Sequence, residues 1–297
     1  MQLTFLGTAC MVHTKERNQS GIFLKYKGEG ILFDCGEGIQ RQLKIAGIKL
    51  TEITKILISH WHGDHVLGLP GLLQSMGMSE YSGTLEIYGP KNIGKQVSGA
   101  IQAFGGYTSP VPIKVKEVSD DVFFEGKDFM LASAVLKHSI PCVGFVFQEN
   151  DRRRINLDVT RKLGIPEGPL LGELQDGRPV KWKNKTITPN EATYIVKGRK
   201  LAVIVDTLFT QNCLTLADGA DLLVCEATYA SKEQEKAKEF KHLTAAEAAQ
   251  IAAKANVKRL ILTHFSQRYK NTQEIEEDAR TIFNSVVCAK DFMKITV

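Results

Sequence analysis

The sequence lacks the segments that would place a protein in a membrane or export it. No apolar run approaches the ~18–20 residues that cross a bilayer. The opening residues Met1-Gln2-Leu3-Thr4-Phe5 are typical of a strand start and carry no charged-then-apolar leader. These absences predict a cytoplasmic protein that has no membrane partner.

The sequence also lacks paired cysteines. The six cysteines, at positions 10, 35, 142, 213, 225 and 288, are scattered and form no CxxC pair. A chain of 297 residues can bury a sizeable core without cross-links, so a disulfide framework is not expected. We interpret the cysteines as reduced thiols that fill the core.

A strong excess of one charge is missing too, except in one segment. The formal net charge of the chain is +5, and 24% of its residues are charged. Residues 151–200 hold twelve Lys or Arg and six Asp or Glu, a local charge of +6, so the rest of the chain sums to −1. This concentration of positive charge suggests an anionic partner for the segment.

Short apolar runs alternate with amphipathic segments along most of the chain. They predict strands over 3–6, 21–26, 31–33, 55–59, 84–88, 113–118, 129–136, 143–148, 193–196, 201–205, 222–225 and 259–263. Helices are predicted over 37–46, 67–77, 92–104, 211–218, 244–256 and 271–284. Thr244 and Glu247 form a capping box, and Gly47 and Asn256 stand where helices should end. The mixture predicts an α/β fold with two sheets sandwiched between helices, because each sheet needs both faces covered.

Residues 150–192 break this rhythm, being rich in charge, glycine and proline. The segment is long for a connection, so it is either a disordered insert or a functional arm. Its cations include Arg152-Arg153-Arg154, Arg161-Lys162, Lys181, Lys183 and Lys185. These cations suit contact with a nucleic-acid backbone that does not depend on the base sequence. The alternative is that the segment is merely a solvated charged loop.

The run His60-Trp61-His62-Gly63-Asp64-His65 places three imidazoles and a carboxylate within six residues. Imidazole and carboxylate suit metals such as zinc. His60 and His62 are one residue apart, so an extended strand end points both to the same side. Asp64 and His65 lie on the following turn and reach a neighbouring position. The spacing predicts two metal sub-sites built from one loop, rather than a chance cluster of surface histidines.

Three further polar residues follow buried strands. His138 comes soon after the run 134–136, Asp206 directly follows 201–205, and His264 follows 260–263. Sites gather at this end of the strands in such sheets. A single histidine after a strand is often a hydrogen-bonded loop residue, but the repetition beside the His60–His65 run predicts that these residues complete the metal shells.

Two histidines remain. His13 sits in a charged loop and is interpreted as an ordinary surface residue. His242 stands two residues before the capped helix, whose positive end favours phosphate. We therefore take His242 as a candidate functional residue.

The His60–His65 box with the later His, Asp and His resembles the metallo-β-lactamase superfamily, and within it the ribonuclease Z family of tRNA 3′-processing endonucleases. The resemblance runs nearly end to end. It includes the motifs Phe5-Leu-Gly-Thr8, Lys15-Glu-Arg-Asn18, Leu32-Phe-Asp-Cys-Gly-Glu37, Gln40-Arg-Gln42, Cys225-Glu-Ala-Thr228, His242-Leu-Thr244 and Thr263-His-Phe-Ser-Gln-Arg-Tyr269. It implies an αββα sandwich of two mixed β-sheets flanked by helices, a single domain over 1–297 with 150–192 inserted as a flexible arm.

The resemblance also implies a cofactor: two zinc ions per subunit, which Mn²⁺ or Mg²⁺ is able to replace. One zinc would be held by His60, His62 and His138, the other by Asp64, His65 and His264, with Asp206 bridging both. Such a centre would remove the 3′ trailer from precursor tRNA and leave a 3′-hydroxyl.

Catalytic roles follow from that expectation. Asp64 is the candidate to orient the attacking water and accept its proton. His242, steered by Glu226, is the candidate to protonate the leaving oxygen. Candidate phosphate contacts are Arg268, Ser266 and the amide end of the helix that begins at Thr244.

The resemblance makes the arm an exosite for the tRNA elbow, with Gly168-Pro169 in its glycine-proline motif. Arg152, Arg153 and Arg154 are the candidates to contact the tRNA backbone. The resemblance also implies a homodimer in which one subunit's arm serves the other's active site. The chain departs from the family pattern at His13, usually proline, and around Asp206. There Ile204-Val205 replace a Ser-Gly pair and Leu208-Phe209 replace polar residues.

Two other functions compete with this one. A small-molecule phosphodiesterase or other hydrolase of the same superfamily would share the metals but has no use for a basic arm. A non-catalytic RNA-binding module with a degenerate site is less favoured, because every expected ligand is present.

Overall fold

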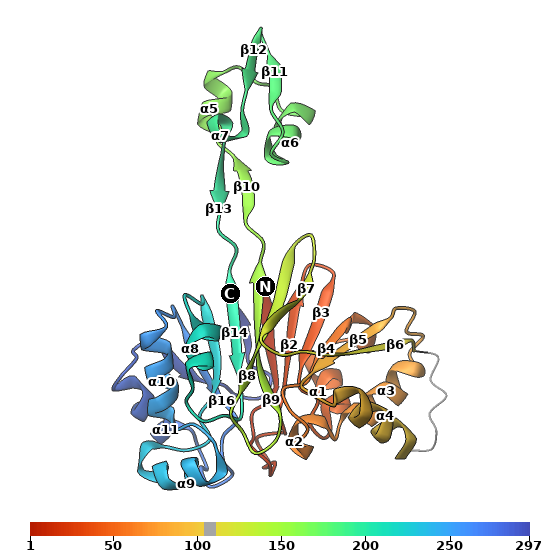
Figure 1. Cartoon of the computed structure of the whole chain (residues 1–297), viewed down its shortest axis with the longest axis vertical. Coiled ribbons are helices and arrows are strands. Elements are labelled where there is room, and N and C mark those ends of the chain that lie inside the picture. Colours follow the sequence, from red (N-terminus) through yellow and green to blue (C-terminus); the bar gives the residue numbers. More distant parts are fainter. Residues whose placement is uncertain (104–110) are drawn as a thin grey trace. The chain divides into compact units, whose positions relative to one another are not determined.

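The computed structural model describes residues 1–103 and 111–297 (Figure 1). Their contacts divide the chain into two compact units. The first comprises 1–125, 131–147 and 200–297, and the second comprises 126–130 and 148–199. Each strand and helix expected from the sequence has a counterpart, although residue 104, the end of the expected helix 92–104, lies outside the described residues.

The first sheet of the first unit has seven strands. Their order is β18 (Lys294–Thr296), β1 (Gln2–Gly7), β2 (Gly21–Tyr26), β3 (Glu29–Phe33), β4 (Lys55–Leu57), β5 (Leu85–Gly89) and β6 (Ile113–Glu117). Pairing is antiparallel from β18 to β3 and parallel from β3 to β6. Parallel neighbours need crossover connections. These contain α1 (Ile39–Ala46), η1 (Leu50–Glu52), α2 (Gly63–Val66), α3 (Leu69–Gly77) and α4 (Ile93–Ala103).

The second sheet also has seven strands. Their order is β17 (Val286–Cys288), β16 (Leu260–Thr263), β15 (Leu222–Glu226), β14 (Lys200–Ile204), β9 (Cys142–Glu149), β8 (Phe129–Leu136) and β7 (Asp121–Glu125). The strands β14 to β17 are parallel. Their crossovers contain α8 (Gln211–Ala217), η2 (Ser231–Glu233), α9 (Gln234–Phe240), α10 (Ala245–Lys254) and α11 (Gln273–Arg280).

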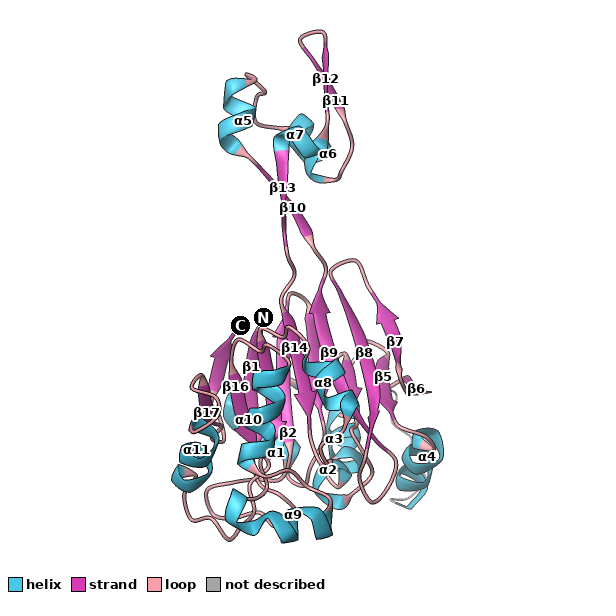
Figure 2. Cartoon of the chain, turned by 60° about the vertical axis from the view of Figure 1, so that its left-hand side comes forward, coloured by secondary structure: helices cyan, strands magenta, loops and turns pink. Residues whose placement is uncertain are grey.

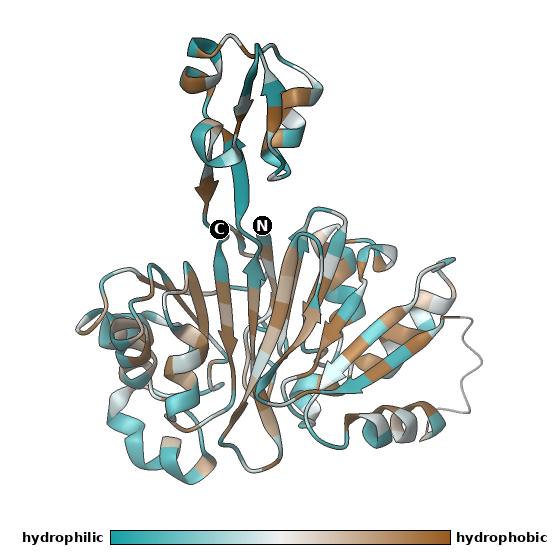
Figure 3. Ribbon diagram, turned by 45° about the horizontal axis from the view of Figure 1, so that its top comes forward, coloured by the Kyte–Doolittle hydropathy of each residue, from teal (hydrophilic) through white to brown (hydrophobic). Residues whose placement is uncertain are grey.

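The two sheets pack face to face, with helices on their outer sides (Figure 2). Ring contacts join the sheets: the centroids of Tyr26 and Phe147 are 5.1 Å apart, and those of Phe33 and Phe145 are 6.2 Å apart. Apolar residues of α1, α3 and α4 pack on the first sheet, and those of α8, α10 and α11 pack on the second. The strands are accordingly rich in hydrophobic residues (Figure 3). The predicted αββα sandwich of two mixed sheets is confirmed.

The expected helix ends are confirmed as well. Thr244 caps α10 through the reciprocal box with Glu247. Gly47, after α1, has φ 74°, and Asn256, just beyond α10, has φ 52°. Both adopt the left-handed conformation that ends helices and that glycine and asparagine tolerate best.

The second unit contains secondary structure that the sequence patterns did not predict. Its elements are β10 (Arg152–Ile155), α5 (Leu157–Lys162), α6 (Pro169–Gln175), β11 (Val180–Trp182), β12 (Lys185–Ile187), α7 (Pro189–Ala192) and the expected β13 (Thr193–Val196). β10 pairs antiparallel with β13, and β11 with β12. A small core of Ile165, Leu174, Val180, Ile187 and Ala192 holds these elements together. The ordered elements and core argue against a disordered insert.

No helix within residues 1–103 and 111–297 is long and apolar enough to cross a membrane. All six cysteines are free, and five of them are buried. His13 is exposed, as expected for a surface residue.

Candidate metal centre

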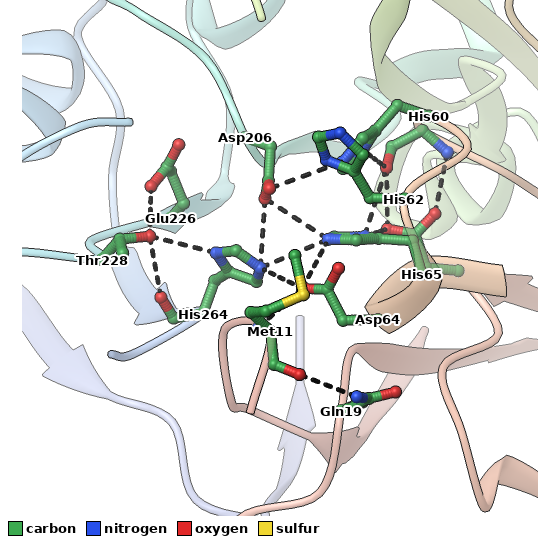
Figure 4. A network of polar contacts seen from close by, with 12 residues as sticks. Met11, Gln19, His60, His62, Asp64, His65, Asp206, Glu226, Thr228 and His264 are labelled. Carbon is green, nitrogen blue, oxygen red and sulfur yellow. Dashed lines mark hydrogen bonds and ion pairs between the residues drawn. The ribbon is translucent and has the colours of Figure 1, made fainter. Parts of the chain in front are cut away.

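Strand ends of both sheets deliver polar side chains to one place. Asp34 follows β3, Asp206 comes two residues after β14, and His264 follows β16. Each of the three has a positive φ, of 58°, 34° and 62° respectively. Such backbone is uncommon for residues other than glycine and costs about 1–3 kcal/mol. The side chains of Asp206 and His264 point toward each other (Figure 4).

The His60–His65 run supplies the other half of the centre. His60 lies in the loop after β4, His62 is the N-cap of the short helix α2, and Asp64 and His65 are in α2 itself. His60, Asp64 and His65 are almost completely buried, whereas His62 is half-buried. One loop and the following helical turn thus present four side chains to the ends of the strands.

The first group of side chains is formed by His60, His62, His138 and Asp206. Nδ1 of His62 lies 3.0 Å from Nε2 of His60 and 3.2 Å from Nε2 of His138. Oδ2 of Asp206 lies 3.5 Å from Nε2 of His60 and 3.9 Å from Nε2 of His138. These ligand atoms all lie within 4.8 Å of one another, so the group could hold a metal ion.

The second group is formed by Asp64, His65, His264 and again Asp206. Nε2 of His264 lies 3.2 Å from Nε2 of His65, 3.3 Å from Oδ2 of Asp64 and 3.2 Å from Oδ1 of Asp206. This group also satisfies the geometry for a metal ion. Asp206 offers one carboxylate oxygen to each group and so lies between them. The structure therefore brings together all seven residues that the sequence predicted as metal ligands.

The far nitrogens of the imidazoles are held by other groups of the chain. Nδ1 of His65 contacts Oδ2 of Asp34 at 2.7 Å, and Nδ1 of His138 contacts the Lys241 carbonyl at 3.0 Å. Nδ1 of His60 and His264 face the hydroxyls of Ser59 and Thr228, each at 3.0 Å. Such outer contacts fix the ring orientation and leave Nε2 facing the centre.

The electrostatics of the centre favour a cation. Burial opposes ionisation of Asp206, but His264 and His65 hold the pKa of its carboxyl well below its usual range. Burial likewise opposes the charged form of His65, and Asp206 and Asp64 outweigh it and raise the pKa of this imidazole. Oδ1 of Asp64 is buried and receives no hydrogen bond within the described residues. Ionised carboxylates beside several imidazole nitrogens are a donor set that fits a divalent metal ion.

Glu226, His242 and Thr228 lie beside the second group. Nδ1 of His242 is 3.2 Å from both carboxylate oxygens of Glu226. Glu226 is fully buried and also accepts hydrogen bonds from the Thr207 amide at 2.8 Å and the Thr228 hydroxyl at 2.6 Å. These hydrogen bonds fix Glu226 in contact with the His242 ring.

The predicted phosphate contacts have other partners in this structure. Arg268 forms an ion pair with Glu233 at 2.9 Å. The hydroxyl and amide of Thr244 are both engaged by the Glu247 carboxylate, at 3.0 and 2.9 Å. Ser266 is half-buried, two residues after His264. Arg152, Arg153, Arg154, Gly168 and Pro169 all belong to the second unit.

Two residues that support the centre were not singled out from the sequence. Asp34 holds His65 and also accepts hydrogen bonds from the Ser59 amide and hydroxyl, at 2.7 and 2.9 Å. Thr228 holds His264. Both follow buried apolar strands, Asp34 directly after β3 and Thr228 two residues after β15, which is the signal that identified Asp206 and His264.

The unusual residues around Asp206 belong to the core. Ile204 and Val205 are buried, and Phe209 packs against the apolar cluster behind the second sheet. The Leu208 amide donates to the Lys137 carbonyl at 2.9 Å, one residue before His138. The apolar substitutions leave Asp206 in place between the two groups.

Comparisons with known proteins place the chain among named relatives. Residues 1–105 match a family model described as Anti-Pycsar protein Apyc1. Over 298 aligned residues the chain is 42% identical to a ribonuclease Z from Methanothermobacter thermautotrophicus, and the match covers 100% of this chain and 97% of the relative.

Solved structures give a consistent result. Human tRNase Z, short form, has a TM-score of 0.73 and 29% identity to this chain, with 100% of this chain and 99% of that chain covered. The metallo-beta-lactamase fold protein YhfI from Bacillus subtilis has a TM-score of 0.72, 17% identity and coverage of 99% and 98%. The second likeness supports the fold alone.

Proposed function

The chain belongs to the ribonuclease Z family, and from this premise we propose that it is an endoribonuclease that removes the 3′ trailer from precursor tRNA. The cut leaves a 3′-hydroxyl on the tRNA. The observation that carries this proposal is the pair of His and carboxylate groups that share Asp206, in a chain 42% identical over its full length to a ribonuclease Z.

The centre is proposed to bind two zinc ions, with Mn²⁺ or Mg²⁺ able to substitute. His60, His62 and His138 would hold one ion, Asp64, His65 and His264 the other, and Asp206 both. Two divalent ions at such a site lower the pKa of a water molecule and neutralise phosphate oxygens. The fit rests on the donor set and on the buried Oδ1 of Asp206, which receives no hydrogen bond within the described residues.

Asp64 is proposed to accept the proton of the attacking water. Its Oδ2 lies 3.4 Å from His65 Nε2 and 3.3 Å from His264 Nε2, and it also accepts the Met11 amide at 2.8 Å. Its Oδ1 accepts no hydrogen bond from any residue that the structure describes. The two oxygens therefore differ in role, and Oδ1 is the one free to orient water and take its proton.

His242 is proposed to protonate the leaving oxygen. Burial opposes its charged form, but Glu226 and Asp206 outweigh burial and raise the pKa of His242 above the ordinary value. A larger fraction of His242 is then protonated near neutral pH. Because Nδ1 faces Glu226, Nε2 is the atom available to donate the proton.

Arg268 and Ser266 are proposed to contact the phosphate oxygens of the substrate. The Thr244 hydroxyl is hydrogen-bonded to Glu247. Thr244 is therefore proposed to act as the N-cap of α10, whose positive end favours phosphate. In the second unit, Arg152, Arg153, Arg154 and the Gly168-Pro169 step are proposed to contact precursor tRNA. Gly168 has φ 138°, a conformation that glycine tolerates, and Pro169 begins α6.

Assembly and location are also proposed by family membership. We infer a homodimer in which the second unit of one subunit serves the active site of the other, working in the cytoplasm. A small-molecule phosphodiesterase is not favoured by the ribonuclease Z relatives.

Cleavage of a 3′-extended tRNA precursor by the zinc-loaded protein tests the proposal. We expect one cut at the 3′ side of the tRNA body and a 3′-hydroxyl product. Asp64→Ala should abolish the cut, because it removes both a ligand of the second group and the proton acceptor. Equal cleavage by wild type and Asp64→Ala would identify a contaminating nuclease and refute the proposal.

A further inference from the structure

A strained turn at residues 10–12 lies beside the metal centre. The Val12 amide donates to the Cys10 carbonyl at 2.6 Å, which closes a three-residue turn around Met11. Met11 has φ 50°, and three-residue turns with a positive central φ are rare and strained. The Cys10 amide donates to the Phe265 carbonyl at 3.0 Å, so the start of the turn is fixed to the residue after His264.

This turn aims a backbone N–H at a residue of the centre. The Met11 amide donates to Oδ2 of Asp64 at 2.8 Å, across 53 residues of sequence (Figure 4). A charge-assisted bond of this kind is stronger than one between neutral groups. It occupies Oδ2, and the proton-accepting oxygen Oδ1 remains free of hydrogen bonds.

The side chains of Met11 and Val12 do not hold the turn. Met11 is 51% exposed and Val12 is 42% exposed, and His13 is exposed as well. A strained conformation persists only where the surroundings determine it. Hydrogen bonds therefore keep the turn in place, and Met11 itself makes two of them.

Gln19 supplies the second of these bonds. Its Nε2 donates to the Met11 carbonyl at 2.8 Å, and its Oε1 accepts the Glu37 amide at 3.0 Å. Gln19 is buried, with 6% of its surface exposed. A methyl group added to Gly36 would lie 2.7 Å from Cβ of Gln19, so these two residues pack closely against each other.

We propose that Gln19 is a positioning residue for the reaction, because it holds the Met11 carbonyl so that the Met11 amide stays on Asp64. The link runs from Glu37 through Gln19 and Met11 to Asp64, and each step is one hydrogen bond. Without the Gln19 donor, the turn relaxes toward negative φ and the amide leaves Oδ2. Oδ2 of Asp64 keeps its contacts with His65 and His264, but Oδ1 loses the fixed orientation in which it would accept a proton. The role in catalysis rests on the proposed function.

The test uses Gln19→Glu in the full-length, zinc-loaded protein. Glutamate keeps the acceptor for the Glu37 amide but replaces the donor with an oxygen that repels the Met11 carbonyl. We expect kcat on precursor tRNA to fall about 10–100-fold, the usual effect of outer contacts on a metal site. KM, bound zinc and the unfolding temperature should stay at wild-type values. Gln19→Leu, which is neutral and also lacks the donor, should show the same loss.

Asn18→Asp is the matched control. Asn18 is the neighbouring amide and donates to the Glu37 carbonyl at 2.8 Å, without contact to Met11. This variant should keep the wild-type kcat. Wild-type kcat in both Gln19 variants would overturn the proposal. A loss of zinc or of thermal stability in step with kcat would also overturn it, because Gln19 would then serve folding alone.

Hydrogen exchange of the Met11 amide, measured in metal-free protein, separates this proposal from the proposed function. Exchange should be slow in wild type and Asn18→Asp and fast in both Gln19 variants. A protein that fails to cut precursor tRNA but shows this pattern would refute the proposed function and leave the hydrogen-bonded link standing. Equal exchange in all four proteins would refute the link itself.

Discussion

His242 stands apart from the other histidines beside the two metal groups, because it belongs to neither group and its Nδ1 faces Glu226. Glu226 lies 3.2 Å from that nitrogen and is itself held by Thr207 and Thr228. Glu226, His242 and His264 could also hold a metal ion of their own. Replacing His242 therefore distinguishes two roles. If His242 is a proton donor, the loss of activity depends on the leaving group of the substrate. If it is a metal ligand, the variant loses bound metal.

We expect His242→Gln to slow precursor tRNA cleavage about 10²–10⁴-fold, the usual contribution of a positioned acid. Hydrolysis of a p-nitrophenyl phosphodiester should fall much less, since nitrophenolate leaves without a proton. Steady-state kinetics on both substrates, with zinc measured in each preparation, checks this. His13→Gln, at an exposed histidine, is the control. Equal losses on the two substrates, or lost zinc, would exclude the acid role.

The sequence predicted site residues correctly where a metal-binding residue type stood at a telling position, in a crowded run or just after a strand. The crowded His60–His65 run and the polar residues after strands identified all seven side chains that the structure gathers. Asp34 carried the same signal and was not singled out. Contacts such as the Lys241 carbonyl on His138 and the Met11 amide on Asp64 come from backbone atoms, which no residue type reveals.

Among the elements, α10 connects stability with the site, because its N-cap, Thr244, lies two residues after His242. Thr244 accepts the Glu247 amide and caps the first turn. We expect Thr244→Ala to lower the free energy of unfolding by about 1 kcal/mol, the usual value of an N-cap. Urea denaturation with an unchanged m value measures this loss.

Thr210 provides a matched control, since it is also an N-cap threonine but its side chain makes no capping hydrogen bond to α8. Thr210→Ala should change the stability by less than about 0.5 kcal/mol, as for ordinary surface changes. If both substitutions lower the free energy of unfolding equally, the capping hydrogen bond of Thr244 adds nothing to stability.

Element prediction succeeded where apolar periodicity was long. Phe129–Leu136 and Gly21–Tyr26 are strands with the predicted bounds. The second unit was harder, because β11 and β12 have three residues each and α7 has four. Segments this short show no period, and their core of five buried residues depends on contacts distant in sequence.

Across the whole molecule, positive charge is concentrated in residues 151–200, and the structure shows which of these charges are paired. In the second unit, Arg178 pairs with Glu173 and Asp176, Lys197 with Asp151, and Arg199 with Glu149. Arg153 donates to Asn190 and Thr193. The remaining cations have no acidic partner among the described residues: Arg152, Arg154, Arg161, Lys162, Lys181, Lys183 and Lys185. β10, which contains Arg152 and Arg154, is hydrophilic, whereas its partner strand β13 is hydrophobic (Figure 3).

Unpaired cations release counterions from an RNA backbone when they bind it, so their contribution appears in the salt dependence of affinity. We expect the combined Lys181→Ala, Lys183→Ala and Lys185→Ala variant to reduce the slope of log K against log salt by about 2–3, at about 0.7–0.9 per phosphate contact. Binding of precursor tRNA to the metal-free protein, measured at several salt concentrations, gives this slope. Hydrolysis of the p-nitrophenyl phosphodiester should not change, because these lysines belong to the second unit.

Arg178→Ala serves as the control for charge removal, because this arginine is exposed and already paired within its own unit. Its slope should stay close to that of wild type, since an exposed ion pair adds little net charge toward a partner. If the arginine variant and the triple lysine variant shift the slope by the same amount per charge, net charge alone governs binding. Paired and unpaired cations would then be equivalent, and the lysines of the β11–β12 hairpin would have no special role in tRNA contact.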